Sequence, residues 1–221
     1  NPVDRTEKFM FDGERLIQHI IKQRYFEEEI NNEVNLSYSD NQVTVTTDYL
    51  TLVYTLNSEG YASQCVYSLS SQNRIYQFSY SAEGYLTGIV ENIDDTEYSS
   101  TSLTYENGDI TSISSKMNGL ENKFIYEPGE ESSTYHLPCL GLLEIHPLTF
   151  HIEALYAGLL GKDPRHFTMH SCPAGSNDEK TVYSYGFDKK GNPSRMICQT
   201  TYAGGQASYY PYTRNISISF E

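Results

Sequence analysis

One short pattern recurs along this chain at a fixed interval, and it constrains the fold more than any other feature. Each copy has alternating apolar residues that end in an aromatic, then a polar turn with glycine or asparagine, then two apolar residues spaced as L-x-x-I. The turn glycines Gly60, Gly84 and Gly108 follow one another at intervals of 24 residues. A repeat of this length is one supersecondary unit that needs neighbours to bury its apolar face. Each unit is predicted to be a β-hairpin, because glycine and asparagine supply the positive φ of tight hairpin turns.

The segments between the turns alternate apolar and polar residues over long stretches. In the stretch 212–220, one side of an extended strand carries Tyr212, Arg214, Ile216, Ile218 and Phe220. The other side carries only threonine, asparagine and serine. Parallel strands that are buried on both faces read as continuous apolar runs instead. The alternation therefore predicts an antiparallel meander with one wet face.

The number of such stretches limits how the meander can be arranged. They predict about twelve to fourteen strands, more than an open twisted sheet usually holds without curling. The expected fold class is mainly β: an antiparallel up-and-down meander curled into a closed or partly open barrel. Leu86 and Ile89, which follow the turn at Gly84, have opposite parity. A β-bulge just past the turn would return both side chains to the inner face.

A bacterial outer-membrane barrel has the same meander, so it has to be weighed as an alternative. Its outward face must be an apolar band flanked by aromatic girdles. This chain offers one apolar face and a second face rich in threonine and serine, and its mean hydropathy is −0.52. These features favour an apolar interior and a polar outer surface over a membrane pore.

Residues 148–159 break the strand pattern and have the period of an amphipathic helix. The apolar positions at helical spacing are Leu148, Ile152, Leu155, Tyr156 and Leu159. Thr149 can cap the start, while Gly161 and Pro164 follow the end. The pattern predicts one helix of about three turns. A barrel this wide leaves interior space, so we expect the helix to plug the lumen or to cap one mouth.

The charge balance excludes two classes of partner. Lysine and arginine number 15 against 29 aspartate and glutamate, which gives a formal net charge of −14. Nucleic acids and anionic membrane surfaces need a positive footprint on the protein, so neither is expected to bind. No run of residues is long and apolar enough for a membrane-spanning helix.

The hairpin copies, the segment YAGLLGK and the later hairpin YSYGFDKKGNPSRM together resemble a family of Bacteroides lipoproteins of unknown function with a porin-like fold. YAGLLGK is the most specific element of this resemblance, which covers nearly the whole chain. It implies one porin-like barrel domain over residues 1–221, export through a lipidated signal sequence, and a lipid-anchored position at the outer membrane facing the periplasm or the cell surface. The start at Asn1 without methionine fits a leader removed on export. The family has no assigned activity, so no catalytic residue and no cofactor are expected, and a monomer is expected.

Residues 136–173, which include the helix, form an insertion that holds five of the six histidines. His166, His170 and Cys172 would ligate zinc if a helical turn brought the histidines onto one face. The alternative is a loop of surface histidines with a buried or bridged cysteine. It is favoured because two prolines crowd the segment and no carboxylate is obviously placed to orient an imidazole. No metal site is therefore expected.

The four cysteines are Cys65, Cys139, Cys172 and Cys198, and they include no CxxC pair. This spacing excludes a zinc ribbon or a thioredoxin motif. Their even number permits two disulfides in an exported protein, although core cysteines are as common. Cys139 or Cys172 with a nearby histidine can assemble a nucleophile, but chance pairs of this kind are frequent.

The sequence therefore favours a non-enzymatic envelope lipoprotein that binds a glycan or a protein partner. The run SYYPY places Tyr209, Tyr210 and Tyr212 beside Pro211, which disrupts a strand ladder and favours an exposed edge. Rings there can stack on sugar faces, although rings that cover the rim of the core are the more common case. Two alternatives stay open: a carrier that holds a small apolar ligand in the barrel, and a hydrolase that uses the His/Cys segment.

Overall fold

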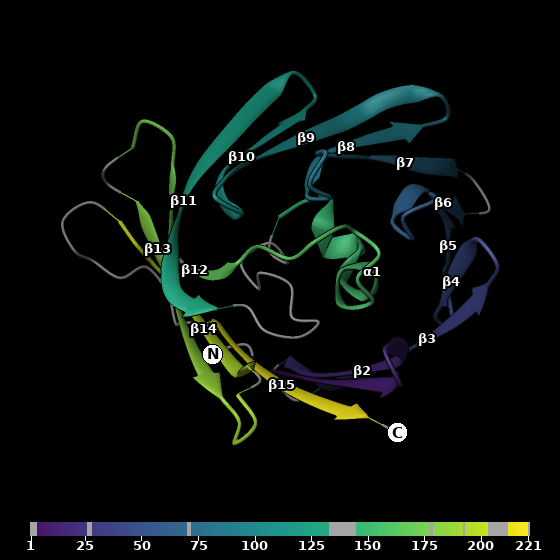
Figure 1. The fold of residues 1–221 in the computed structure, drawn as a ribbon, viewed down its shortest axis with the longest axis horizontal. Helices are drawn as coiled ribbons and strands as arrows, with labels where there is room; N and C mark the ends of the chain where they lie inside the picture. Colours follow the sequence, from purple (N-terminus) through teal and green to yellow (C-terminus); the bar gives the residue numbers. More distant parts are fainter. Residues whose placement is uncertain are drawn as a thin grey trace.

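The protein is a ring of strands with a short helix inside it (Figure 1). The computed structural model describes residues 4–25, 28–69, 72–132, 145–176, 179–191, 193–202 and 212–220. The strands are β1 (Asp4–Asp12), β2 (Arg15–Tyr25), β3 (Glu28–Ser39), β4 (Gln42–Thr46), β5 (Thr51–Leu56), β6 (Ala62–Leu69), β7 (Gln72–Tyr80), β8 (Leu86–Ile93), β9 (Thr96–Glu106), β10 (Asp109–Met117), β11 (Leu120–Ser132), β12 (His166–Pro173), β13 (Lys180–Phe187), β14 (Pro193–Thr201) and β15 (Tyr212–Phe220). A 3-10 turn at Leu148–Phe150 and the helix α1 (Ile152–Tyr156) come between β11 and β12.

The fifteen strands of these ranges close into a barrel in which chain neighbours pair side by side. The ring closes between β1 and β15, and this pair is parallel, from Asp4 opposite Thr213 to Phe11 opposite Phe220. In a meander with an odd number of strands the first and last strands run in the same direction, so closure requires one parallel pair. The predicted barrel is confirmed, with one strand more than the upper end of the expected range.

The repeated turns have the backbone geometry that the sequence predicts. Gly60, Gly84 and Gly108 have φ values of 85°, 91° and 89°, a region that glycine enters at no steric cost. The pairing of β7 with β8 shifts register just past the Gly84 turn. Leu86 and Ile89 are consequently both buried. The predicted bulge is confirmed, and it increases the local twist that bends the sheet into a barrel.

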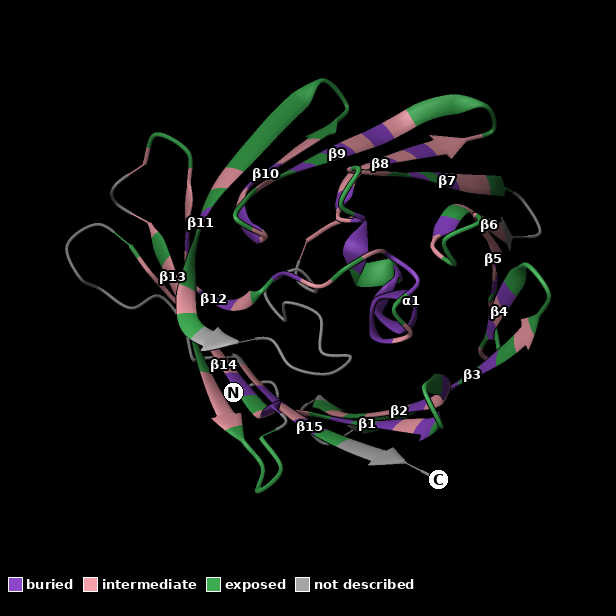
Figure 2. Ribbon diagram, in the orientation of Figure 1, coloured by how far each residue is buried: buried purple, intermediate pink, exposed green. Residues whose placement is uncertain are grey.

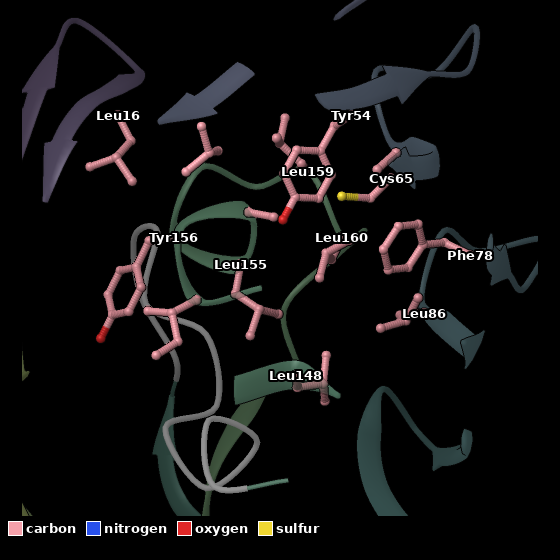
Figure 3. Packing of buried hydrophobic residues seen from close by; sticks show 14 of the residues in the cluster. Leu16, Tyr54, Cys65, Phe78, Leu86, Leu148, Leu155, Tyr156, Leu159 and Leu160 are labelled. Carbon is pink, nitrogen blue, oxygen red and sulfur yellow. The ribbon is translucent and has the colours of Figure 1, made fainter. Parts of the chain in front are cut away.

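The inner face of the barrel is apolar, as predicted. Figure 2 shows buried residues on α1 inside the ring and at intervals along the strands, and exposed residues at the hairpin ends. Figure 3 shows Leu155, Leu159 and Leu160 facing Tyr54 and Phe78 across the interior. The apolar positions of the predicted helix are all buried, namely Leu148, Ile152, Leu155, Tyr156 and Leu159. The interior of the barrel is therefore a packed core on the side where α1 lies.

The helix is shorter than the sequence pattern predicts. In place of about three turns, residues 148–160 form the 3-10 turn, the five residues of α1 and a series of turns. Thr149 does not cap α1, which begins after His151 without a side-chain hydrogen bond. Gly158 has a φ of 70°, which takes the chain out of the helix two residues after α1 ends. Among the described residues, no helix has the length and apolar character needed to span a membrane.

Residues 145–165, here called the inner segment, are fastened to the barrel wall by three histidine contacts. His146 Nε2 lies 2.8 Å from Glu91 Oε2, and His151 Nδ1 lies 2.8 Å from the Tyr54 hydroxyl. Glu153 Oε1 lies 2.7 Å from Nδ1 of the wall residue His19. Complete burial lowers the pKa of His151 to about 3, so this imidazole stays neutral and packs as an aromatic ring.

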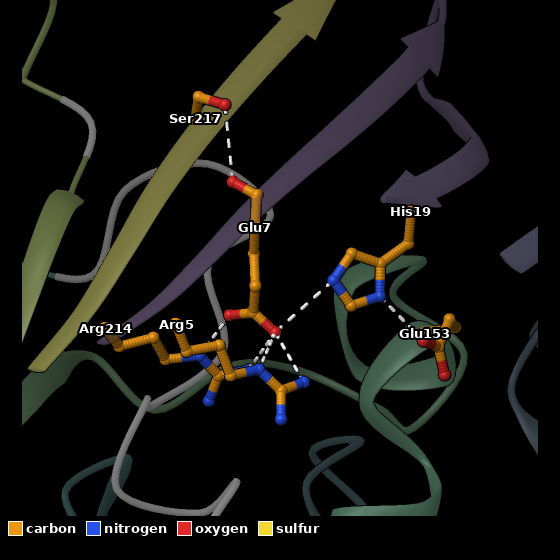
Figure 4. Close-up of polar contacts among 6 residues, drawn as sticks. All are labelled: Arg5, Glu7, His19, Glu153, Arg214 and Ser217. Carbon is orange, nitrogen blue, oxygen red and sulfur yellow. Dashed lines mark hydrogen bonds and ion pairs between the residues drawn. The ribbon is translucent and has the colours of Figure 1, made fainter. Parts of the chain in front are cut away.

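A cluster of buried charges joins the closing strands to the inner segment (Figure 4). Glu7 on β1 accepts hydrogen bonds from Arg214 on β15, one of them 2.8 Å long from Nη2 to Oε1. Arg5 Nη2 lies 2.7 Å from the same oxygen. His19 Nε2 lies 3.3 Å from Glu7 Oε1, and Nδ1 of the same ring contacts Glu153 of α1. One network of charged side chains therefore links the parallel pair of strands, β1 and β15, to the helix α1.

The network shifts the pKa values of its two central members in opposite directions. Burial is the largest influence on Glu7 and opposes ionisation, but the hydrogen bonds of His19 and Arg214 outweigh it and lower the pKa of this carboxyl. Burial likewise opposes the charged form of His19, but Glu153 and Glu7 outweigh it and raise the pKa of the imidazole. The raised pKa favours a protonated His19 between the two carboxyl groups.

Stability is expected to fall as the solution becomes alkaline. A raised folded-state pKa means that the contribution of His19 is fully present below its ordinary value of 6.5 and is lost as pH rises through the folded-state value. Chemical unfolding of the native protein from pH 6 to pH 9 should show this decline, and His19→Gln should flatten it. His170→Gln, at a half-exposed histidine, should leave the decline intact. Parallel pH profiles for native protein and His19→Gln would contradict the assignment.

Candidate binding groove at the barrel rim

The inner segment ends by docking on three consecutive copies of the hairpin repeat. The amide of Ala62 donates to the Leu159 carbonyl at 2.7 Å, beside the first turn. The amides of Lys162 and Arg165 donate to the carbonyls of Gly84 and Gly108 at 2.9 and 3.0 Å. The bonded positions of the inner segment follow one another at intervals of three residues, while their partners on the three hairpins are 22 and 24 residues apart. Two strand spacings and three residues of extended chain both measure about 10 Å, which is why the two series can match.

The docking requires the second glycine of the YAGLLGK segment. Gly161 has a φ of 87°, and a Cβ atom there would lie 2.6 Å from the carbonyl oxygen of Gly84 and 3.1 Å from the Tyr80 ring. No side chain at position 161 fits between the backbone of the inner segment and the backbone of the Gly84 turn. The most specific element of the sequence resemblance is thus the place where the inner segment approaches the wall most closely.

The docked segment and two of the turns enclose a groove at the barrel rim, with a volume of about 730 Å³. Tyr85 and Tyr105 stack on one another there, with ring centroids 4.9 Å apart and planes inclined by 29°. Polar side chains and two cations surround the stacked rings. The lining residues are Ser81, Glu83, Tyr85, Thr87, Leu103, Thr104, Tyr105, Asn107, Gly108, Lys162 and Arg165. This set, here called the rim groove, combines an aromatic platform with hydrogen-bond donors and acceptors on rigid turns.

The rim groove contains both positively and negatively charged side chains. Lys162 and Arg165 are exposed, and in the part of the chain that the structure describes neither forms an ion pair. Glu83 is exposed as well, and a hydrogen bond from Ser81, aided by Lys162, holds its pKa below the ordinary value. Asp163 lies between the two cations in the sequence, and burial raises its pKa to about 6.

A second pocket, of about 380 Å³, lies between β10, β11 and β13 and the start of the inner segment. Its apolar lining includes Ile113, Phe124, Tyr126 and Ile145, with the His146 imidazole as a polar neighbour. Pockets with an apolar lining and few polar groups are typical binding sites for small apolar molecules.

The structure does not bring the three candidate zinc ligands together: His170 and Cys172 line one small pocket, and His166 is not part of its lining. The segment expected to be a loop is strand β12, because residues 166–173 pair with β11 along their length. No helical turn gathers the histidines: His166 Nδ1 contacts Asp109 Oδ2 at 2.9 Å, and His170 Nδ1 contacts Glu127 Oε2 at 3.1 Å. The expectation that no carboxylate is placed to orient these imidazoles is therefore wrong. Across the described ranges, no group of three or more histidine, cysteine or acidic residues is arranged to hold a metal ion.

The other candidate residues are placed only in part. Tyr209, Tyr210, Cys139 and His136 lie outside the described residues, and Tyr212 begins β15 with a side chain that is not described. The proposal of an aromatic surface at SYYPY thus stays a prediction.

Two of the cysteines considered for a disulfide or a nucleophile are Cys65 and Cys172. Cys65 is a buried free thiol, and burial raises its pKa to about 12. Cys172 is a half-buried free thiol. In the described ranges, no hydrogen bond joins Cys172 to a histidine.

Sequence reasoning missed the rim groove. A tyrosine directly follows the turn glycine at Gly60-Tyr61 and at Gly84-Tyr85. Of these two, only Tyr85 lines the groove, because Tyr61 packs against Tyr80 while Tyr85 stacks on Tyr105 of the next hairpin. Lys162 and Arg165 carried no signal of their own, because their position depends on docking against turns more than fifty residues away.

Comparison with known proteins finds similarity over most of the chain. The family model described as "Domain of unknown function (DUF4595) with porin-like fold" matches residues 11–195. The crystal structure of a porin-like protein from Bacteroides uniformis ATCC 8492 is similar, with a TM-score of 0.78 and 28% sequence identity, over 90% of this chain and 83% of that chain. No curated protein matches. The matched range covers the repeat, the inner segment and the groove between them.

Proposed function

Because this chain belongs to the family of domains of unknown function with a porin-like fold, we propose that it is a non-enzymatic binding protein of the bacterial cell envelope that holds a saccharide in the rim groove. The observation that carries this proposal is the stacked pair Tyr85 and Tyr105 in a groove with polar walls. The relationship to a Bacteroides porin-like protein supports the envelope location, and a lipid anchor on the precursor is part of the proposal.

The groove suits a saccharide because a sugar ring has an apolar face and polar edges. The face can lie on an aromatic ring, whose electron-rich surface attracts C–H groups. The hydroxyl groups at the edges need donors and acceptors nearby, and Ser81, Thr87 and Asn107 provide them. The turns are held by the docked inner segment, so the site is formed before the ligand arrives, which reduces the entropy lost on binding.

Removing one ring of the platform should weaken saccharide binding. Tyr85→Ala is expected to lower the affinity for an oligosaccharide selected on a glycan array by about two- to tenfold, because an aromatic contact contributes about 0.5–1.5 kcal/mol. Titration calorimetry on the full chain measures the change. Tyr49→Ala, at a tyrosine that is 67% exposed and lies outside the groove, is the control and should bind like native protein. Equal affinity of all three proteins would count against the rim groove as the binding site.

The second pocket, between β10, β11 and β13, favours a second candidate function, that of a carrier for a small apolar ligand. Its volume of about 380 Å³ is within the range of ligand pockets. If this function holds, a fluorescent fatty acid should bind, and Phe124→Glu should abolish the binding while Tyr85→Ala leaves it unchanged. A fatty acid that binds neither native protein nor Tyr85→Ala would remove this candidate.

A further inference from the structure

We infer that the rim groove selects anionic saccharides, with Lys162 and Arg165 holding a carboxylate or sulfate group of a sugar whose ring lies on Tyr85. This inference rests on the proposed function and specifies the chemical class of its ligand. Three observations carry it: the fixed positions of the two cations, their freedom from ion pairs among the described residues, and the closeness of both Arg165 and the Tyr85 hydroxyl to the Gly108 turn.

The positions of the two cations are set by the barrel and not by flexible loops. The backbone amides of Lys162 and Arg165 are bonded to the turn carbonyls of Gly84 and Gly108. Their Cα atoms are therefore held on two neighbouring hairpins, although both side chains are exposed. Fixing the backbone in advance lowers the ordering cost of a charged contact with a ligand.

Arg165 lies directly beside the platform. A Cβ atom at Gly108 would be 2.9 Å from Arg165 Nε and 2.7 Å from the Tyr85 hydroxyl oxygen. Both groups therefore fill the space that a side chain at this turn would occupy. A sugar that stacks on Tyr85 brings its ring substituents next to the guanidinium group, whose planar donors match the two oxygens of a carboxylate.

The charge of the whole chain makes this local arrangement informative. With a formal net charge of −14, the protein repels polyanions at long range. The chain has 15 basic residues and 29 acidic ones. In the described part of the chain, the two exposed cations in the groove nevertheless have no acidic partner within ion-pair distance. Glu83 attracts Lys162 across the groove, so Arg165 is the cation more available to a ligand. Screening at physiological salt limits the long-range repulsion to about 8 Å, which leaves contact charges to decide selectivity.

The test compares acidic sugars with their neutral counterparts on the full chain. The probes are oligogalacturonate and its methyl ester for carboxylate, and a sulfated galactan oligosaccharide without uronic acid and its desulfated form for sulfate. We expect at least one acidic probe to bind about tenfold or more tighter than its uncharged counterpart, because charged hydrogen bonds contribute about 1.5–3 kcal/mol. This preference should shrink as NaCl is raised.

Two matched double variants locate the preference. Lys162→Gln with Arg165→Gln should abolish the preference, so that each acidic probe binds no more tightly than its uncharged counterpart. Lys116→Gln with Arg195→Gln removes the same charge at two exposed positions outside the groove and should keep the preference. A preference that survives the first double variant overturns the inference, as does equal or absent binding of the acidic probes. Binding of an uncharged probe that Tyr85→Ala weakens would still uphold the proposed function, whereas unchanged binding by Tyr85→Ala would overturn that function as well.

Discussion

Arg214→Ala is expected to lower the free energy of unfolding by about 3–5 kcal/mol, because it leaves the Glu7 carboxylate buried without its main partner. The side chains of Glu7 and Arg214 are 0% and 2% exposed, so water cannot replace the lost hydrogen bonds without opening the barrel. Both residues lie on the two strands that close the ring. The loss should therefore be larger than for any surface charge on the same sheet.

Urea unfolding measured with a spectroscopic signal from the tyrosines tests this expectation. Arg195→Ala is the matched control, because Arg195 lies on the neighbouring strand β14 but is exposed. A surface change of this kind usually alters the free energy of unfolding by less than about 0.5 kcal/mol. The double variant Glu7→Leu with Arg214→Met should regain much of the loss, since apolar residues can replace a buried ion pair. Equal losses for Arg214→Ala and Arg195→Ala would show that the cluster does not stabilise the closure.

Gly161→Ala is expected to detach the inner segment from the turns and to lower the free energy of unfolding by about 3 kcal/mol. A left-handed backbone costs a non-glycine residue about 1–2 kcal/mol. In addition, the new Cβ would lie 2.6 Å from the Gly84 carbonyl oxygen, a backbone atom that cannot move without the hairpin. The hydrogen bond from the Lys162 amide to that same oxygen would be lost, at a further cost of about 1 kcal/mol.

Gly158→Ala separates the two effects. Gly158 has a φ of 70°, but a Cβ atom there would have no neighbour within 4 Å. This variant should therefore lose only the conformational part, about 1–2 kcal/mol. Gly161→Ala should also weaken saccharide binding in the rim groove, whereas Gly158→Ala should not. The contact between the segment and the Gly84 turn would be refuted if both variants lost the same stability and kept the same affinity.

The mainly β barrel could be predicted because each hairpin carries its own signal. Alternation along a strand shows which side chains face inward, and a glycine with positive φ marks each turn. The parallel pair β1 and β15 could not be predicted, since it depends on whether the number of strands is odd. A counting error of one strand among about fourteen changes the direction of the closing pair, and sequence patterns do not locate strands that well.

The length of the helix was overestimated for a specific reason. Leu148, Leu155 and Leu159 are all buried, as the helical period requires. However, the last of these faces the wall from a turn and not from a helix, because Gly158 redirects the chain. A periodic apolar pattern shows which side chains are buried. An irregular segment inside a barrel can bury side chains at this spacing as well as a helix can.

The binding groove was not predictable from local patterns, because it forms between two parts of the chain. The tyrosines belong to the repeat, and the cations belong to the inner segment. Their meeting depends on three backbone hydrogen bonds of long sequence separation, and backbone bonds leave no residue signature except Gly161, where a side chain is excluded. The histidines attracted attention in the sequence but contact acidic side chains on neighbouring strands, at Asp109 and Glu127.

Hydrogen exchange of three amides tests most directly whether the inner segment is docked across the repeated turns. These are the amides of Ala62, Lys162 and Arg165, which bond the inner segment to three successive hairpins. In native protein they should exchange far more slowly than in a free peptide, with protection close to that of the amides in β7 and β8. Exchange of the Lys162 and Arg165 amides at free-peptide rates, with the strands still protected, would contradict a docked inner segment and the groove that depends on it.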